Sequence, residues 1–348
     1  MMRINLNNPS TGFRSWLLLT GLTFLGGTLL SAKELNVYTH RHYKADEEIN
    51  ALFTERTGIK VNVVSAEADQ LIERLKSEGA NSPADLLVTV DAGRLQRAKE
   101  AGLLKPLKSE VLEQRVPAAL RDPGGHWYAY ALRARVILYA QDRVKPGEIS
   151  NYEDLADPKW RGRLLIRSSG NAYNQSLLAS LIAADGEEKA EAWAKGVVAN
   201  LARPPQGGDR DQIKGVASGL ADVCVSNTYY LGMLLNSKDP AEQAAAKKVT
   251  VLFPNQTGRG THANIAGAGL TVYAKNAENA KAYLEFLTTP EIQKLIANGT
   301  YEFPVNRDLS LSETHKAWGE FKLDEVTFPQ IGRYQEQAVR LFDKAGWK

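Results

Sequence analysis

Hydrophobic and polar residues alternate along the chain with two different periods, one typical of strands and one typical of helices. The segments 34–40, 59–66 and 84–91 are short apolar runs, and the third is nearly continuous, as in a strand that is buried on both faces. Segments 44–58 and 67–79 lie between them, place apolar residues three and four positions apart, and each ends at a glycine. This succession of strand, helix, strand, helix and strand predicts an α/β fold with a mostly parallel sheet and helices on both faces.

The rest of the chain continues the pattern with longer elements. Residues 127–141 predict one or two long strands, and shorter strands are expected over 162–168, 223–227 and 249–255. A long helical stretch covers 171–201. No repeat with a period of about 20–50 residues is visible, which argues against a solenoid.

The N-terminal segment has a different character. Arg3 and Arg14 precede a short apolar run that contains several Gly and Thr residues, and the small pair Ser31-Ala32 follows it. This order predicts a signal peptide over residues 1–32, which would direct export to the periplasm. A retained membrane anchor is the alternative, whereas a lipid anchor is disfavoured because no cysteine follows the apolar run.

Composition and charge narrow the classes of function. The 348 residues include 43 Lys and Arg against 40 Asp and Glu, so no strongly basic surface for nucleic acid is expected. Cys224 is the single cysteine and lies in an apolar run, so we expect it to be buried. No nucleophile elbow, zinc-binding helix or paired-cysteine motif indicates an enzyme. The glycines of the stretch 264–269 predict close strand packing, and His315 is expected on an exposed helix face.

Three of the expected strand ends each deliver a tyrosine to the start of the next helix. Open α/β sheets bind ligands at the carboxyl ends of strands and at helix N-termini, so these positions are candidates for one site. The residues concerned are His42, Tyr43, Tyr173, Tyr229 and Tyr230. Ser226, Asn227 and Thr228, which all favour helix N-caps, stand just before the adjacent pair Tyr229 and Tyr230. The alternative to a binding role for this pair is that both are half-buried aromatic side chains that only contribute packing. Three such strand ends together favour a shared site.

Three stretches of the sequence resemble a known family. They are PADLLVTVDAGRLQRAKEAGLLKPL (83–107), YEDLADPKWRGRLLI (152–166) and the region from AYLEFLTTPEIQKLI to YEFPVN (282–306). These stretches are similar to the extracellular solute-binding proteins of ABC importers, and in particular to the ferric-iron-binding branch. The likeness covers nearly all of residues 34–348.

The resemblance implies a fold of two α/β lobes, joined by crossing strands, with a ligand in the central cleft. It also implies that each lobe is discontinuous in sequence. The expected lobes are 34–130 plus 263–305, and 131–262 plus 306–348. The hydrophobic pattern alone would have suggested a simple division near residue 130.

The resemblance also implies a set of metal ligands. One branch of the family combines a histidine, two adjacent tyrosines and a borrowed anion, whereas another uses four tyrosines and no anion. This chain looks like the second branch, with Tyr43, Tyr173, Tyr229 and Tyr230 as ligands and His42 as a possible fifth. Phenolate oxygens are hard anionic donors, which suit Fe(III) better than sulfur donors would. Four phenolates over-neutralise Fe(III), so Arg133 and Arg135 are candidates for balancing the charge, with a solvated or structural role as the alternative.

The expected function is therefore that of the extracytoplasmic Fe(III)-binding subunit of an ABC importer. Such a protein would act as a monomer, deliver iron to a membrane permease, and perform no catalysis. The same fold could instead bind an organic anion, a polyamine or a sugar phosphate, because a fold does not determine a ligand.

Overall fold

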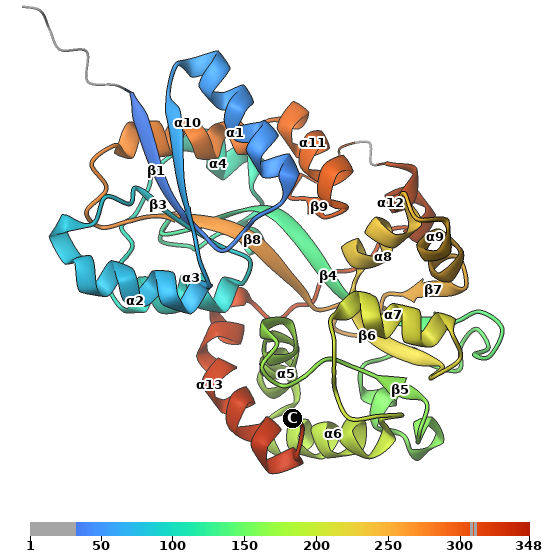
Figure 1. Ribbon diagram of the computed structural model, residues 1–348. Helices are drawn as coiled ribbons and strands as arrows, with labels where there is room; N and C mark the ends of the chain where they lie inside the picture. Colours follow the sequence, from blue (N-terminus) through green and yellow to red (C-terminus); the bar gives the residue numbers. More distant parts are fainter. Residues whose placement is uncertain (1–32, 307–308, 310–311) are drawn as a thin grey trace, which may run out of the picture. The chain divides into compact units, whose positions relative to one another are not determined.

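The computed structural model of the protein describes residues 33–306, 309 and 312–348 (Figure 1). The expected signal peptide lies outside these residues, so it stays a prediction. In the described part of the chain, no helix combines the length and the hydropathy that crossing a bilayer requires.

The described strands form a mixed sheet in the order β2-β1-β3-β8-β4-β6-β5, and β7 and β9 also pair with β4. The strands are β1 (Glu34–Thr39), β2 (Lys60–Ser65), β3 (Leu86–Thr89), β4 (Tyr128–Ala140), β5 (Leu164–Leu165), β6 (Val223–Asn227), β7 (Val249–Leu252), β8 (Ala263–Leu270) and β9 (Phe303–Pro304). β1 is parallel to β2 and β3, and β5 is parallel to β6. β4 and β8 are antiparallel to all their partners. The α/β class with a mixed sheet is confirmed, and its parallel pairs flank the two central antiparallel strands β8 and β4.

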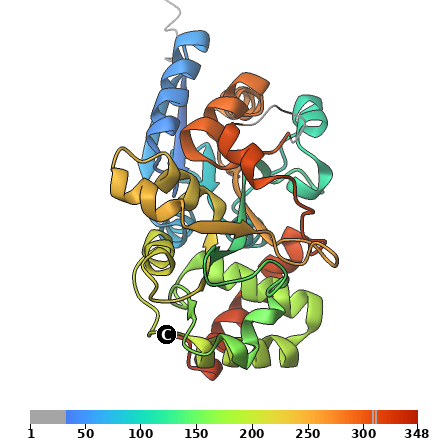
Figure 2. The ribbon, with the colours of Figure 1, turned by 90° about the vertical axis from the view of Figure 1, so that its right-hand side faces the viewer.

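Helices cover both faces of the sheet, as the right-handed connections between its parallel strands require. They are α1 (Lys44–Thr57), α2 (Ala68–Glu78), α3 (Ala92–Glu100), α4 (Glu110–Arg115), α5 (Ala172–Asp185), α6 (Glu187–Asn200), α7 (Asp209–Ala217), α8 (Thr228–Leu235), α9 (Pro240–Ala246), α10 (Ala277–Leu287), α11 (Pro290–Thr300), α12 (Glu313–Trp318) and α13 (Phe328–Ala345). Around β1 and β3, helices α1 and α10 lie on one side and α2 and α3 on the other (Figure 1). The turned view shows α1, in blue, at the end of the described chain opposite its C-terminus (Figure 2). The last helix, α13, packs against α3, α5 and α6.

A single long strand, β4, joins the two parts of the sheet. Its residues Tyr128–Ala134 pair with β8, and the residues from Arg135 onward pair with β6 and β7. Twelve of its 13 residues are buried, including Arg133 and Arg135. The predicted one or two strands over 127–141 are therefore one strand, and two charged side chains lie in the interior.

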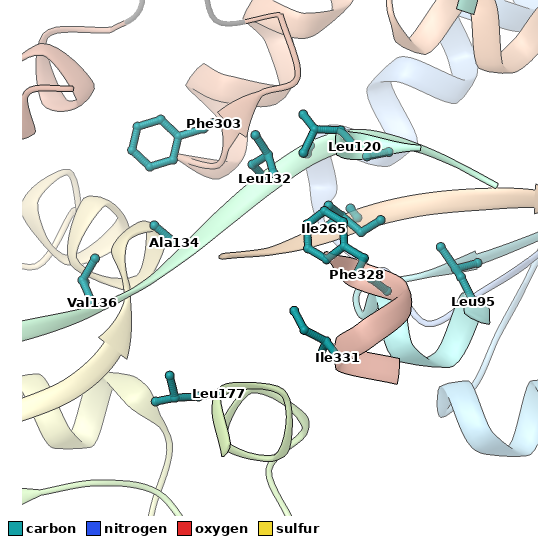
Figure 3. Packing of buried hydrophobic residues seen from close by; sticks show 14 of the residues in the cluster. Leu95, Leu120, Leu132, Ala134, Val136, Leu177, Ile265, Phe303, Phe328 and Ile331 are labelled. Atoms are coloured by element: carbon teal, nitrogen blue, oxygen red, sulfur yellow. The ribbon is translucent and has the colours of Figure 1, made fainter. Parts of the chain in front are cut away.

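The hydrophobic core follows β4 through the molecule. Leu132, Ala134 and Val136 are buried along the strand, with Ile265 of β8 beside it and Phe303 above it (Figure 3). β4 contributes to the core both where it pairs with β8 and where it pairs with β6 and β7. The position of β4 therefore determines where the ends of these neighbouring strands lie.

Three local expectations can be compared with the structure. Cys224 is fully buried in β6, as predicted. A Cβ atom at Gly269 in β8 would lie 2.7 Å from the backbone oxygen of His126, which confirms close strand packing. The exposed position expected for His315 is wrong, because its side chain is 1% exposed, with Nε2 3.2 Å from the carbonyl oxygen of Tyr301.

Candidate functional site

The tyrosines expected at three strand ends line one cleft of about 740 Å³. Tyr43 is the N-cap residue of α1, just after β1, and Tyr173 lies in the first turn of α5. Tyr229 and Tyr230 lie in the first turn of α8, directly after β6. His42 lines the same cleft, so the structure brings all five predicted residues together.

Contacts between the phenol rings are short. The ring centroids of Tyr229 and Tyr230 are 4.1 Å apart, and those of Tyr43 and Tyr229 are 6.3 Å apart. The Tyr229 hydroxyl donates a hydrogen bond to the Tyr173 hydroxyl at 3.3 Å. Asn227 is the N-cap of α8, although its side chain makes no capping hydrogen bond. Side chains from three separate elements therefore meet at the start of α8.

Burial controls the protonation of these phenols. It raises the pKa of Tyr43 and of Tyr229 far above that of free tyrosine. Burial, followed by the neighbouring Tyr173, also raises the pKa of Tyr230 to about 12. These three side chains are consequently neutral near pH 7, and a cation that binds them must displace their protons.

His42 lies at the exposed edge of the cleft. Its ring is stacked on that of Tyr43, with centroids 6.1 Å apart and planes inclined by 15°. Its Nδ1 atom is 3.3 Å from the carbonyl oxygen of His40. When Nδ1 carries the proton and donates it to this carbonyl, Nε2 keeps a lone pair for a metal, an arrangement common among metal-binding histidines.

The two arginines of β4 have different surroundings. Arg133 Nη1 donates to the Tyr173 hydroxyl at 3.0 Å, and its guanidinium carbon lies 5.5 Å from the centroid of the Tyr229 ring. Arg135 instead donates to Asp209 at 2.5 Å and to Asn174 of α5 at 2.6 Å. Both side chains are buried, so a solvated role is excluded. Arg133 therefore bonds to a phenol oxygen, whereas Arg135 lies over the Tyr173 ring at 6.0 Å and bonds to the helix that carries it.

Sequence reasoning missed a buried ion-pair group behind the phenols. Glu302 is fully buried and accepts hydrogen bonds from both Arg41 and Arg133. Burial alone would raise the pKa of the Glu302 carboxyl, but the Arg133 and Arg41 guanidinium groups hold it below its usual range. Arg41 and Glu302 are 261 positions apart, so no local pattern could have paired them.

The remaining histidines differ in their relation to the site. His40 also lines the cleft, and its Nδ1 atom lies 3.3 Å from the carbonyl oxygen of Ala66 and 3.5 Å from a carboxylate oxygen of Glu67. His262 is buried beside a separate cavity of about 50 Å³, and burial lowers its pKa to about 3. Across the residues that the structure describes, no group of three or more His, Cys, Asp and Glu side chains is placed to hold a metal. The lining of the cleft offers four phenol oxygens, the imidazoles of His40 and His42, and the carboxylates of Glu67 and Asp91.

Comparison with known proteins agrees with this chemistry. The model of the bacterial extracellular solute-binding protein family matches residues 81–322. Iron uptake protein A1 of Synechocystis is 52% identical over 316 residues, which cover 91% of this chain and 88% of that protein.

Two solved structures have nearly the same fold. A Trichodesmium protein (IdiA, FutA), in complex with iron and citrate ligands, has a TM-score of 0.87 and 50% identity over 90% of this chain and 100% of that one. The ferric binding protein from Campylobacter jejuni has a TM-score of 0.86 and 46% identity, again over 90% of this chain and 100% of the other. The two-lobe fold class is therefore confirmed.

Proposed function

The chain belongs to the family of bacterial extracellular solute-binding proteins, and we propose that it captures ferric iron in the tyrosine cleft and delivers it to a membrane permease. It is the extracytoplasmic Fe(III)-binding subunit of an ABC iron importer, because relatives that match nearly its whole length are iron uptake and ferric-binding proteins. This kinship favours ferric iron over the alternative of an organic anion, a polyamine or a sugar phosphate.

One observation carries the assignment of ligands, namely that four phenols from three distant segments meet in a single cleft. We assign Tyr43, Tyr173, Tyr229 and Tyr230 as the iron ligands. His42 completes the set through Nε2, which its contact with the backbone of His40 leaves free. This proposal is supported by the contact between the Tyr173 and Tyr229 hydroxyls at 3.3 Å.

The chemistry of the cleft suits a small and highly charged cation. Oxygen donors that are anionic when bound select hard cations over the softer ones that prefer sulfur. Fe(III) and four phenolates carry one net negative charge, and Arg133 already donates to the Tyr173 hydroxyl from within the protein. A buried guanidinium at this position places a positive charge beside the proposed ligands, so a borrowed anion is not required.

Release of the iron requires the cleft to open. We propose that the lobes are 34–130 plus 263–305 and 131–262 plus 306–348, and that they rotate about the crossing strands β4 and β8. The iron-loaded form would dock as a monomer on the permease, and residues 1–32 would direct export before they are removed. As in other transport proteins of this family, the cleft binds its ligand without transforming it.

Absorption spectroscopy tests the ligand assignment. Ferric iron added to the purified protein should produce a visible phenolate-to-iron charge-transfer band, and each of four Tyr→Phe changes, at positions 43, 173, 229 and 230, should weaken or shift it. Tyr334→Phe is a matched control, because Tyr334 lies on α13 and does not line the cleft. A colourless complex would reject tyrosine ligation. Calorimetry that detects an organic anion but no ferric iron would reject the iron function itself.

A further inference from the structure

The turn Thr300–Glu302 joins α11 to β9. It contacts residues that hold each of the elements carrying a candidate iron ligand. We propose that this turn is a positioning element of the iron site and that Glu302 is its central positioning residue. The inference rests on the proposed function, because it concerns the placement of the same tyrosines. Three separate contacts carry it, one for each element that supplies a phenol.

The first contact reaches the loop that carries His42 and Tyr43. Glu302 Oε2 accepts a hydrogen bond from Arg41, whose side chain is 2% exposed. Arg41 also donates to Asp46 at 2.8 Å, and its guanidinium carbon lies 4.6 Å from the centroid of the Tyr43 ring. Asp46 in turn accepts from the backbone nitrogen of Tyr43 at 3.1 Å. The arginine is thus held between two carboxylates, and the Tyr43 ring rests against it.

The second contact reaches α5. Glu302 Oε1 accepts from Nη2 of Arg133, while Nη1 of the same guanidinium donates to the Tyr173 hydroxyl at 3.0 Å. A guanidinium is planar and rigid, so fixing one of its nitrogens fixes the direction of the other. Glu302 therefore determines where Arg133 presents its hydrogen to Tyr173.

The third contact reaches α8, which carries Tyr229 and Tyr230. Tyr301 adopts a left-handed backbone conformation with φ of 59°, and this conformation ends α11. The Tyr301 side chain then lies against Gly232, where an added Cβ would be 2.6 Å from the Tyr301 Cβ and 3.1 Å from the Trp318 ring. The helix can approach the turn this closely only because position 232 is a glycine.

These contacts have a common consequence. Glu302 has no exposed surface, and both of its arginine partners are buried, so water cannot replace a lost partner. Metal sites depend on such outer partners to orient the ligands. The residues of this turn, far in sequence from the four candidate ligand tyrosines, therefore set the distances between phenols that come from three other elements.

Two variants test the proposal with ferric iron alone as the probe. Glu302→Gln keeps the size of the side chain but removes the charge shared by Arg41 and Arg133. We expect it to lower the ferric affinity by about 10–100-fold and to move the charge-transfer maximum, with partial recovery in Glu302→Asp. A merely structural role would lower the melting temperature and leave the position of the band unchanged.

Gly232→Ala provides an independent test. It remains informative even if Glu302→Gln fails to fold. Alanine favours a helix more than glycine does, yet here it must push α8 away from Tyr301 and displace the adjacent phenols. We expect weaker ferric binding in a folded protein. Glu291→Gln is the control for the charge change, because Glu291 lies in the first turn of α11 and makes an exposed ion pair with Arg56. Gly258→Ala is the control for the added methyl group, whose nearest atom would be 3.8 Å away.

The outcomes separate the two proposals. If the unaltered protein binds ferric iron with a visible band, and the folded variants at positions 302 and 232 match it in affinity and band position, the positioning role is overturned. If the unaltered protein binds no ferric iron, the proposed function fails first. Weakened binding in both variants, with both controls unchanged, supports the role of the turn.

Discussion

Ferric binding should release protons from the tyrosines, and the affinity should therefore rise steeply with pH. Burial raises the pKa of Tyr43 and Tyr229, and it raises the pKa of Tyr230 to about 12, so all three hydroxyls keep their protons at pH 7. The iron-bound state holds fewer protons than the free state, and a rise in pH favours the state with fewer protons. Deprotonation at pH 7 costs about 4 kcal/mol for an ordinary phenol with a pKa of about 10, and about 7 kcal/mol for Tyr230.

The magnitude follows from the number of phenols. If all four tyrosines bind as phenolates, each ferric ion releases about four protons, and the logarithm of the affinity rises by about four for each pH unit near neutrality. Competition against citrate between about pH 6 and pH 8, corrected for the protonation of citrate itself, measures this slope. A pH-stat titration with ferric citrate counts the protons, after subtraction of those taken up by the released citrate. Tyr230→Phe should lower the count by one, and Tyr334→Phe should leave it unchanged.

A different count would refute the reasoning. Release of two protons or fewer would mean that at least two of the four phenols are not ligands. An unchanged count in Tyr230→Phe would show that this hydroxyl keeps its proton in the complex, although it lies in the cleft. Either result would contradict the assignment of the four tyrosines as phenolate ligands, without bearing on the fold.

Three further predictions concern the surroundings of the site and the core. Arg133→Met should weaken ferric binding, which visible titration measures. It should also lower the free energy of unfolding by about 3–5 kcal/mol in denaturant unfolding, because Glu302 loses one of its buried partners. Gly269→Ala should destabilise the protein by about 1–3 kcal/mol in guanidinium unfolding, since the new methyl would lie 2.7 Å from the backbone oxygen of His126, and an unchanged midpoint would contradict this. Leu177→Ala, at a fully buried position of α5, should cost about 2–5 kcal/mol in the same assay, and a loss below this range would mean that the core relaxes around the cavity.

Local pattern was sufficient to predict much of the fold and the position of the tyrosines. Strands and helices were read from the period of their apolar residues, and the end of α1 was marked by Gly58, which adopts φ of 69°. Tyr43, Tyr173 and the pair at 229–230 each stand at the start of the helix that follows a strand, and this place was visible without coordinates. The common cleft then follows from the rule that such ends gather ligands in open α/β sheets.

The groups behind the tyrosines could not be predicted in this way. Arg133 and Arg135 stand in an apolar strand, and a charge is buried there only because Glu302 and Asp209 arrive from distant segments to pair with it. The burial of His315 could not be predicted for the same reason, namely that its partner is distant in sequence. Its contact with the backbone of Tyr301 is not indicated by the residues that surround it in the sequence.

The sequence by itself determined the α/β succession, the family and the residue types that face the cleft, because periodicity, helix stops and motifs are properties of neighbouring positions. Only the tertiary structure decided that β4 is one strand shared by both parts of the sheet, and that one buried carboxylate joins Arg41 to Arg133. The physical reason is that these ion pairs join residues 261 and 169 positions apart, and only the folding of the chain brings such partners together.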